Sequence, residues 1–353
     1  MPERDDIISE KYRICEPLGA GAMGIVFSAV HLETEKQVAL KWLNPALSSY
    51  PSTVERFKRE AKATGRIHHP NVVVIHDCGE HLGQVYLVME LLTGRTLRAR
   101  LNAAPSGKLS LDEALELMFP IMRGVAAAHA AGVLHRDLKP ENVFLAESPD
   151  GLPTVPKVLD FGVAKLQRDT QFAPQLSMPG SVLGTFQYMA PEQLRTETNL
   201  DEGVDIFALG AILYEMLLGA PPYQADNPVD LALQLLDAEA PSLQSRDPAH
   251  SQALSDVVAR ALLRERGQRY ASVEDFATAL EALSEHHCFR GPSRAMPSSQ
   301  PGLPAPHAAT QAANTPLSEA ALVAGSGHAQ NADPPAGSPP MAAAPFAAVS
   351  GAL

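Results

Sequence analysis

One short stretch of the chain carries side chains that could accept a proton and bind a cation. The string HRDLKPEN, residues 135–142, places Asp137, Lys139 and Asn142 in one predicted loop after a long predicted helix. The triplet DFG follows and begins with Asp160. The amide oxygen of Asn142 and the carboxylate of Asp160 suit Mg²⁺, whereas Asp137 stays available to accept a hydroxyl proton. The sequence therefore predicts a cation site beside a general base.

A glycine-rich segment near the N-terminus could hold a phosphate chain. In LGAGAMGIV, the glycines Gly19, Gly21 and Gly24 place no Cβ between the backbone amides and a phosphate. Dinucleotide-binding folds share this pattern, but there the loop opens into a helix. Here Ile25–Val30 and Gln37–Leu43 are typical of two strands. The sequence thus favours a β-hairpin over a dinucleotide-binding loop.

A lysine interrupts the second of these predicted strands. Lys41, in VALK, stands among apolar residues, where a lysine usually faces solvent. Beside a hairpin that holds phosphate, it could instead neutralise phosphate oxygens. Such a lysine needs a carboxylate to orient it, and Glu60 on a predicted helix over Pro51–Ile67 is the candidate. Taken alone, the two residues fit an ordinary surface salt bridge better.

The elements that must position these residues change in kind along the chain. From Tyr12 to Leu91 the pattern predicts strands interrupted by the helix over 51–67, and after Thr96 it predicts mainly helices. A small β-rich lobe followed by a larger helical lobe leaves a cleft between them, where ligand sites tend to lie. The predicted helices of the second lobe are Leu111–Ala131, Asp205–Gly219, Val229–Ala238, Ala253–Leu263 and Val273–Glu285.

Composition bounds the class of protein. Of the 353 residues, 45% are apolar, which suits a globular core, and 40 acidic against 28 basic residues give a net charge of −12. This charge argues against nucleic acid as a partner, because nucleic-acid binding needs a basic face. Three scattered cysteines disfavour a disulfide framework or a zinc site. With no secretory signal or membrane span in the sequence, we expect a cytoplasmic protein.

The C-terminal region differs in composition from the rest. From Gly291 to Leu353 the chain is rich in Pro, Ala, Gly and Ser and carries few charged or bulky apolar residues. Such a segment buries too little apolar surface to offset its chain entropy, so we predict a disordered tail. The pairs Pro334-Pro335 and Pro339-Pro340 could bind a protein that recognises polyproline, but an unstructured spacer is the favoured interpretation.

Taken in order, these motifs resemble the signature of the eukaryotic-type (Hanks-type) serine/threonine protein kinases, in the style of bacterial members. The signature motifs occur in the family's order: the glycine-rich loop, the VALK lysine, the helix glutamate, HRD…N, DFG and finally Ala190-Pro-Glu192. The resemblance covers about Tyr12–Leu283. It implies an α+β, two-lobed protein kinase fold, with a small antiparallel sheet and one main helix in the N-lobe and a larger, mainly helical C-lobe. We predict an N-terminal extension over 1–11, a kinase domain over 12–285 (lobes 12–91 and 96–285) and the tail over 291–353.

The resemblance also implies a reaction. The γ-phosphoryl group of Mg·ATP would pass to Ser or Thr hydroxyls of protein substrates, with Mn²⁺ as an alternative metal. Asp137 would orient the hydroxyl and take its proton, and Lys139 would stabilise the γ-phosphoryl group. Lys41, held by Glu60, would bind the α- and β-phosphates. The implied metal ligands are Asn142 and Asp160.

The remaining implied ATP contacts form the nucleotide pocket. Apolar side chains would cover both faces of the adenine, a gatekeeper would close its back, and two backbone groups would read its edge. Each apolar residue also fits a plain core role. Above the adenine would lie Leu18, Val26 and Ala39, and below it Phe144. Met89 would be the gatekeeper, and the backbone groups would be those of Glu90 and Leu92.

Two serines and one threonine lie in the loop after DFG, where a kinase of this type would be regulated by phosphorylation. Arg136 precedes Asp137, and in family members with this arginine a phosphate on the following loop pairs with it. We expect autophosphorylation, with Ser177 favoured over Ser181 and Thr170.

Three further expectations concern structure. Glu192 and Arg269 match the family's buried ion pair, and Asp205 matches the aspartate that supports the catalytic loop. Pro120, inside a predicted helix, should kink or break it.

Two other classes of function stay open from the sequence. A pseudokinase acting as a binding or scaffold module would keep the fold, but all of the catalytic residue types are present here. A small-molecule kinase of the aminoglycoside type would share the HxD…N logic but should lack the segment GTFQYMAPE, residues 184–192. A partner bound through the tail and a transient homodimer also stay open.

Overall fold

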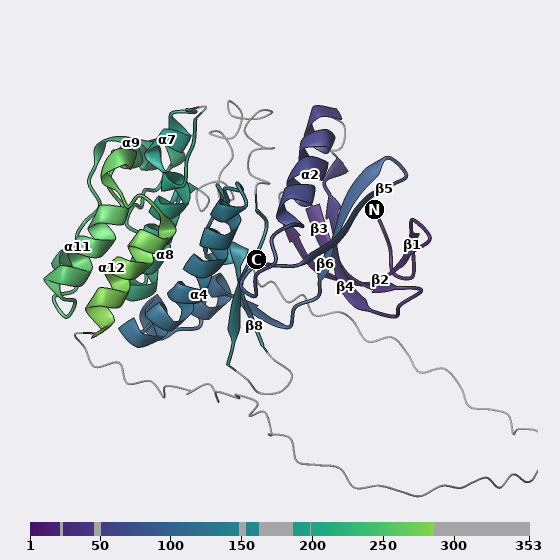
Figure 1. Cartoon of the computed structure of the whole chain (residues 1–353), viewed down its shortest axis with the longest axis horizontal. Coiled ribbons are helices and arrows are strands. Elements are labelled where there is room, and N and C mark those ends of the chain that lie inside the picture. Colours follow the sequence, from purple (N-terminus) through teal and green to yellow (C-terminus); the bar gives the residue numbers. More distant parts are fainter. Residues whose placement is uncertain (22–23, 46–50, 148–152, 162–185, 198, 286–353) are drawn as a thin grey trace, which may run out of the picture. The chain divides into compact units, whose positions relative to one another are not determined.

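The computed structural model describes residues 1–21, 24–45, 51–147, 153–161, 186–197 and 199–285, and for residues 51–53, 56, 60, 284 and 285 only the backbone. Within these ranges a sheet-rich N-terminal lobe is followed by a helix-rich C-terminal lobe (Figure 1). The predicted α+β, two-lobed architecture is therefore confirmed. The predicted tail lies outside the described residues, and the proposed domain boundaries stay predictions.

The N-lobe is built on one antiparallel sheet. Its strands lie in the order β1-β2-β3-β4-β6-β5, so that β4 occupies the centre beside β3 and β6. Trp42 on β4 stacks on Tyr86 of β6, with 6.3 Å between ring centroids, and Tyr12 meets Tyr86 edge-on. These rings form the core on one face of the sheet. The strands are β1 (Ile7–Ile8), β2 (Tyr12–Gly21), β3 (Gly24–His31), β4 (Gln37–Leu43), β5 (Ile75–His81) and β6 (Gln84–Glu90).

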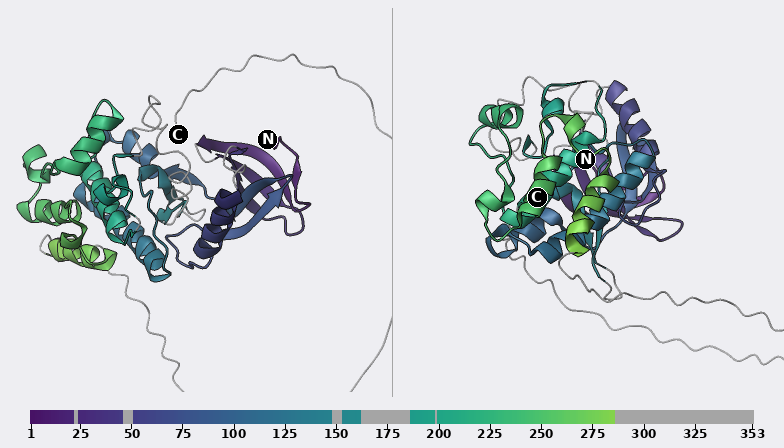
Figure 2. Two further views of the ribbon diagram at one scale, coloured as in Figure 1. Left: turned by 90° about the horizontal axis from the view of Figure 1, so that it is seen from above. Right: turned by 60° about the vertical axis from the view of Figure 1, so that its left-hand side comes forward.

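One helix covers the other face of this sheet. Helix α2 (Pro51–Thr64) begins with a proline, which suits the first helical turn, and places Phe57 and Ala61 one turn apart on the same side. Both side chains pack against Leu43 and Leu87 of the sheet. Figures 1 and 2 show α2 running alongside the strands. The helix ends three residues earlier than the sequence predicts.

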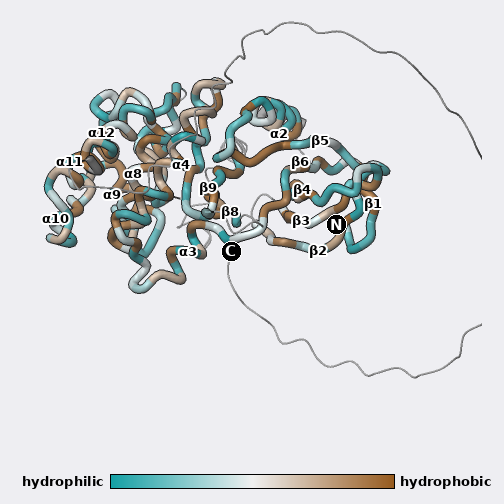
Figure 3. The backbone as a smooth tube through the Cα atoms, turned by 60° about the horizontal axis from the view of Figure 1, so that its bottom comes forward, coloured by the Kyte–Doolittle hydropathy of each residue, from teal (hydrophilic) through white to brown (hydrophobic). Residues whose placement is uncertain are grey.

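The C-lobe is organised around helix α8 (Gly203–Leu218). Nearly all of its residues are buried, because other helices pack around it, and Figure 3 colours this part of the backbone mainly as hydrophobic. Gly219 ends α8 in the left-handed conformation that glycine favours (φ 78°). The surrounding helices are α3 (Leu97–Asn102), α4 (Leu111–Ala130), α7 (Pro191–Leu194), α9 (Pro228–Asp237), α10 (Leu243–Arg246), α11 (Gln252–Ala261) and α12 (Val273–Glu285).

Helix α4 is not broken by its proline. It runs without interruption from Leu111 to Ala130, so the break expected at Pro120 does not occur. Met118, Ile121 and Met122, which flank the proline, are fully buried in the C-lobe core. Packing of this apolar face outweighs the one backbone hydrogen bond that the proline removes.

A second, small sheet joins the lobes and was not predicted. Strands β7 (Gly94–Thr96), β8 (Val143–Ala146) and β9 (Val155–Val158) pair antiparallel. Val73 of the N-lobe donates a backbone hydrogen bond to Val158 O (3.0 Å). This sheet positions the segments on either side of it, because β8 directly follows Asn142 and β9 ends shortly before Asp160.

Among the described residues, no helix is both long enough and apolar enough to cross a membrane.

Candidate active site

The predicted catalytic loop brings its three polar residues into contact. The amide nitrogen of Asn142 donates to the backbone oxygen of Asp137 (2.7 Å) and to its Oδ2 (3.2 Å). Lys139 Nζ donates to the same Oδ2 (3.0 Å). A 3₁₀ turn, Pro140–Asn142, folds the loop back so that these contacts form. The carboxylate of Asp137 is thereby fixed in one orientation, with Oδ1 as the oxygen that these contacts leave unused.

A fully buried carboxylate on α8 holds this loop in shape. Asp205 accepts hydrogen bonds from the backbone N–H groups of His135 (to Oδ2) and Arg136 (to Oδ1), each at 2.8 Å. The second of these residues has φ 65°, a left-handed conformation that is strained for an arginine. The hydrogen bonds from consecutive amides offset that strain. The sequence expectation that Asp205 supports the catalytic loop agrees with this geometry.

Asp205 also pairs with His129 of α4, whose Nε2 lies 2.7 Å from Oδ2. Burial alone would raise the pKa of Asp205, but the hydrogen bond and charge of His129 lower it overall. Burial likewise opposes the charged form of His129, but Asp205 and Glu202 raise its pKa overall. The pair is therefore a buried histidine–carboxylate contact beneath the catalytic loop, in which each charged form favours the other.

This pair makes the stability of the C-lobe depend on pH. Because the native pKa of His129 is raised, its contribution to the free energy of unfolding is complete below the unfolded pKa of about 6.5 and is lost as the pH rises through the native pKa. The difference in unfolding free energy between the wild type and His129→Asn should therefore shrink as urea titrations are repeated at increasing pH above about 6.5. The exposed His68→Asn serves as the control. A difference that stays constant or grows with pH would contradict this assignment.

Lys41 and Asp160 meet between the lobes. Lys41 Nζ lies 2.7 Å from Asp160 Oδ2, and Lys41 is only 5% exposed. Burial alone would raise the pKa of Asp160, but the charge and hydrogen bond of Lys41 lower it overall, so the carboxylate stays ionised. The lysine on β4 is thus directed into the site and not to the surface. The backbone of Glu60 lies on α2, but its side chain, and hence its predicted contact with Lys41, is outside the described residues.

The glycine-rich segment forms the predicted hairpin. β2 and β3 pair up to Gly21 opposite Gly24, so a strand follows the loop and the dinucleotide-binding interpretation is excluded. At Gly24 (φ 145°) a Cβ would lie 1.9 Å from Trp42 O, which only glycine avoids. At Gly21 a Cβ would meet nothing within 4 Å among the residues that the structure describes. An open backbone at the end of a hairpin is what a phosphate chain requires. Gly19 lies on the same strand, opposite Val26.

Four of the predicted adenine contacts lie in one apolar cluster next to this hairpin. Val26, Ala39, Met89 and Leu92 pack together with Val73, Leu91 and Leu159. Leu18 is 48% exposed and Phe144 lies on β8 opposite Lys157; neither belongs to this cluster in the described part of the chain. The sequence analysis does not predict Val73 and Leu159 as members of this cluster. The position of Leu159 directly before DFG would have indicated it.

The segment that would read the adenine edge is held by a side chain. Glu90 Oε1 accepts from Val74 N and from Lys157 Nζ, both at 2.8 Å, and Glu90 N donates to Val74 O (3.0 Å). The end of β6 is thus tied to β9, and the backbone of Glu90 is held against Val74.

The expected buried ion pair is present in the C-lobe. Arg269 donates to both carboxylate oxygens of Glu192, at 2.7 and 2.9 Å, and both side chains are almost fully buried. The neighbouring Gln193 donates to the backbone oxygen of Arg136 (2.9 Å). The Ala190-Pro-Glu192 segment is therefore joined to the catalytic loop. The proposed phosphorylation sites Thr170, Ser177 and Ser181 lie outside the described residues.

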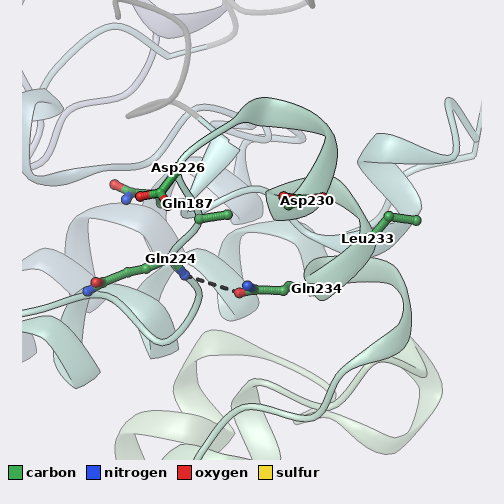
Figure 4. A pocket seen from close by; sticks show the side chains of 7 residues that line it. Gln187, Gln224, Asp226, Asp230, Leu233 and Gln234 are labelled. Atoms are coloured by element: carbon green, nitrogen blue, oxygen red, sulfur yellow. Dashed lines mark hydrogen bonds between the residues drawn. The ribbon is translucent and has the colours of Figure 1, made fainter.

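A polar hollow of about 710 Å³ lies beside this segment, between Gln187 and helix α9. Figure 4 shows the side chains around it, with Gln224 N donating to Gln234 Oε1 (3.3 Å). Among the described residues, its lining carries two carboxylates, Asp226 and Asp230, and no lysine or arginine.

Comparison with known proteins agrees with this geometry. The protein kinase domain family matches residues 12–283. Serine/threonine-protein kinase pkn3 of Myxococcus xanthus is 37% identical over 291 residues, which cover 80% of this chain and 52% of that protein. Serine/threonine-protein kinase PrkC of Bacillus subtilis is 34% identical over 76% of this chain and 40% of its own length. The chain thus spans about half or less of these two relatives.

A solved structure gives the same result for the fold. The kinase domain of Mycobacterium tuberculosis PknI, as a C20A mutant, superimposes with a TM-score of 0.64 at 27% identity, covering 80% of this chain and 99% of that one. The family match extends over most of the chain and includes every described residue of the site. This chain belongs to the protein kinase family.

Proposed function

We propose that the protein is a serine/threonine protein kinase that transfers the γ-phosphoryl group of Mg·ATP to hydroxyl groups of proteins. The observation that carries this proposal is the hydrogen-bonded set Asp137, Lys139 and Asn142, held on one rigid loop. The contact of the buried Lys41 with the partly exposed Asp160 adds to it, and the names of the curated relatives support the choice of serine and threonine.

The chemistry asked of the protein is positioning and electrostatic stabilisation, because phosphoryl transfer needs little covalent work from the enzyme. Oδ1 of Asp137 would accept the proton of the substrate hydroxyl, and the contacts of Oδ2 with Lys139 and Asn142 keep the carboxylate turned for that task. Lys139 Nζ, 3.0 Å from Asp137, would stand where negative charge develops on the transferred group.

The metal that kinases use fits the residues present. The amide nitrogen of Asn142 donates to Asp137, so the Oδ1 atom of Asn142 can act as a metal ligand. Asp160 stays ionised because its pKa is lowered. No group of three or more His, Cys, Asp and Glu side chains forms a metal site in the described ranges, so phosphate and water oxygens would complete the shell. When bound, Mg²⁺ (or Mn²⁺) would neutralise charge on the phosphates.

Nucleotide binding would rearrange the Lys41–Asp160 pair. Lys41 Nζ would move from Asp160 to the α- and β-phosphates, with Glu60 as its partner on α2. The adenine would lie against the apolar cluster of Val26, Ala39 and Met89, with Leu18 above and Phe144 below. The backbone groups of Glu90 and Leu92 would pair with its edge.

Protein substrates would approach over the segment before Ala190 and the hollow beside α9. We further propose autophosphorylation on the loop before this segment, a cytoplasmic location and no nucleic-acid partner. Partners bound through the tail and a transient homodimer belong to the same proposal. We do not favour the pseudokinase alternative, because Asp137 contacts Lys139 and Asn142, and Lys41 contacts Asp160.

Removal of the Asp160 carboxylate tests the metal assignment. We expect wild-type protein to bind ATP more tightly with Mg²⁺ than with EDTA, and Asp160→Asn to lose this difference and to lower transfer by about 10²-fold or more. Asp112→Asn, which removes an exposed carboxylate on α4, is the control. An Asp160→Asn variant that keeps the full Mg²⁺ dependence of ATP binding would refute the role of Asp160.

A further inference from the structure

Four exposed basic residues lie along helix α2, just after its end, and on helix α4. Arg59 and Lys62 are one turn apart on α2, Arg66 follows one turn later, and Arg123 lies on α4. None of the four makes an ion pair or a side-chain hydrogen bond with another residue that the structure describes. We call these four residues the α2–α4 basic patch.

The loop that follows α2 brings Arg123 next to the other three. His69 Nδ1 accepts a hydrogen bond from Asn71 N (3.2 Å). Asn71 lies directly against α4, because a Cβ at Gly124 would come within 2.5 Å of Asn71 O. Arg123, which precedes that glycine, is close enough for its charge to lower the pKa of His69, second only to burial. The patch therefore extends from α2 of the N-lobe, across this loop, to α4 of the C-lobe.

Unpaired cations run against the charge balance of this chain. With 40 acidic and 28 basic residues, carboxylates are in excess. Lys58, the neighbour of Arg59, does find one and pairs with Glu80 (2.9 Å). Glu55 stands one turn before Arg59 on α2, yet the two form no ion pair in the described structure. An exposed group of one sign on a chain of the opposite net charge favours a surface that meets a charged partner.

The chemistry of the patch indicates which partner it fits. Three of its four side chains are guanidinium groups, each of which can bind a carboxylate through two parallel hydrogen bonds. A nucleic acid fits less well, because a chain of net charge −12 repels an extended polyanion beyond the patch. A short segment rich in Asp and Glu would contact the patch alone.

We propose that the α2–α4 basic patch is a docking surface for an acidic segment of a partner protein, whose carboxylates pair with the cations of both lobes. A partner bound in this way would bridge α2, the helix that carries Glu60, to α4 of the C-lobe. The inference does not rest on the proposed kinase function, because no catalytic residue belongs to the patch.

Binding of a labelled peptide to the purified protein tests the charge requirement. In fluorescence anisotropy, a short peptide that alternates Glu and Gly should bind at least about tenfold more tightly than one that alternates Gln and Gly. The affinity for the Glu peptide should fall as salt is added, because exposed charges are screened.

Charge reversal tests the location. Lys62→Glu with Arg66→Glu should weaken binding of the Glu peptide by about tenfold or more, because each change replaces an attraction with a repulsion. The matched control is Arg13→Glu with Arg95→Glu, which makes the same change in net charge at exposed positions on β2 and β7. Its affinity should stay within about two-fold of wild type.

Two further variants test the extent of the patch and guard against misfolding. Arg123→Glu, on the other lobe, should alone weaken binding by about three-fold or more. Lys62→Gln with Arg66→Gln retains good helix formers and should weaken binding in the same direction by a smaller factor. Both should unfold near the wild-type temperature, because the altered side chains are exposed.

Three results would overturn the proposal: equal binding of the Glu and Gln peptides, equal weakening by the control pair and the patch pair, or unchanged affinity in Arg123→Glu. Tighter binding of single-stranded DNA than of the Glu peptide would also overturn it and assign the patch to nucleic acid. Asp137→Asn should bind the Glu peptide as tightly as wild type. Absence of phosphoryl transfer by the wild type would count against the kinase function alone.

Discussion

Asp137→Asn is expected to lower the rate of phosphoryl transfer by about 10²–10⁴-fold, the range that a positioned general base contributes. The asparagine keeps the size of the side chain and can still contact Lys139, but it cannot accept the proton of the substrate hydroxyl. Initial rates with a generic basic acceptor protein and labelled ATP measure the effect. ATP affinity should change little, because Asp137 contacts the loop and not the nucleotide pocket.

The control for this variant is Asp256→Asn, which removes an exposed carboxylate on α11 that contacts only Gln252 in the described structure. Its transfer rate should equal that of the wild type within about two-fold. An Asp137→Asn protein that retained more than about a tenth of the wild-type rate would show that Asp137 is not the base.

Arg269→Met should lower the free energy of unfolding by about 3–5 kcal/mol, the cost of leaving a buried charge without its partner. The Glu192 side chain is 4% exposed and receives two hydrogen bonds from Arg269. The same guanidinium group also donates to the backbone oxygens of Gly203, Leu263 and Arg264, so its loss disconnects the start of α8 as well. Urea unfolding followed by circular dichroism measures the change.

Arg266 offers a matched control three residues away. Its side chain is 40% exposed and lies 3.8 Å from Glu197 and 3.6 Å from Asp201 at the surface. Arg266→Met should cost less than about 1 kcal/mol, because exposed ion pairs contribute little. If both variants were destabilised equally, burial of the Glu192–Arg269 pair would not be what stabilises the C-lobe.

Local patterns allowed much of the fold to be predicted. The strand around Lys41 is a short, largely apolar run, α4 carries apolar residues at helical spacing, and α8 is a long apolar stretch that ends at a glycine, so each of the three shows in the sequence. The polar residues of the catalytic loop could be grouped in advance because they lie within one short string. Residues within one short string lie close together in space whatever fold the rest of the chain adopts.

Contacts between distant segments could not be predicted in the same way. The strands β7–β9 have only three or four residues each, too few to show a period, and they form because they pair with one another. The direct contact of Lys41 with Asp160, and that of Arg98 with Glu215, joins residues more than 100 positions apart. No spacing rule connects them. At Pro120 a local rule failed because the buried face of α4 outweighs it.

The central claim is that this chain transfers phosphate from ATP to serine or threonine by means of Asp137. The most direct test is to incubate the purified protein and its Asp137→Asn variant with γ-labelled ATP, Mg²⁺ and a basic acceptor protein, and then to identify the labelled amino acids. Label on serine or threonine that disappears in the variant is the predicted result. Bound ATP without label in the wild type, or equal label in both proteins, would contradict it.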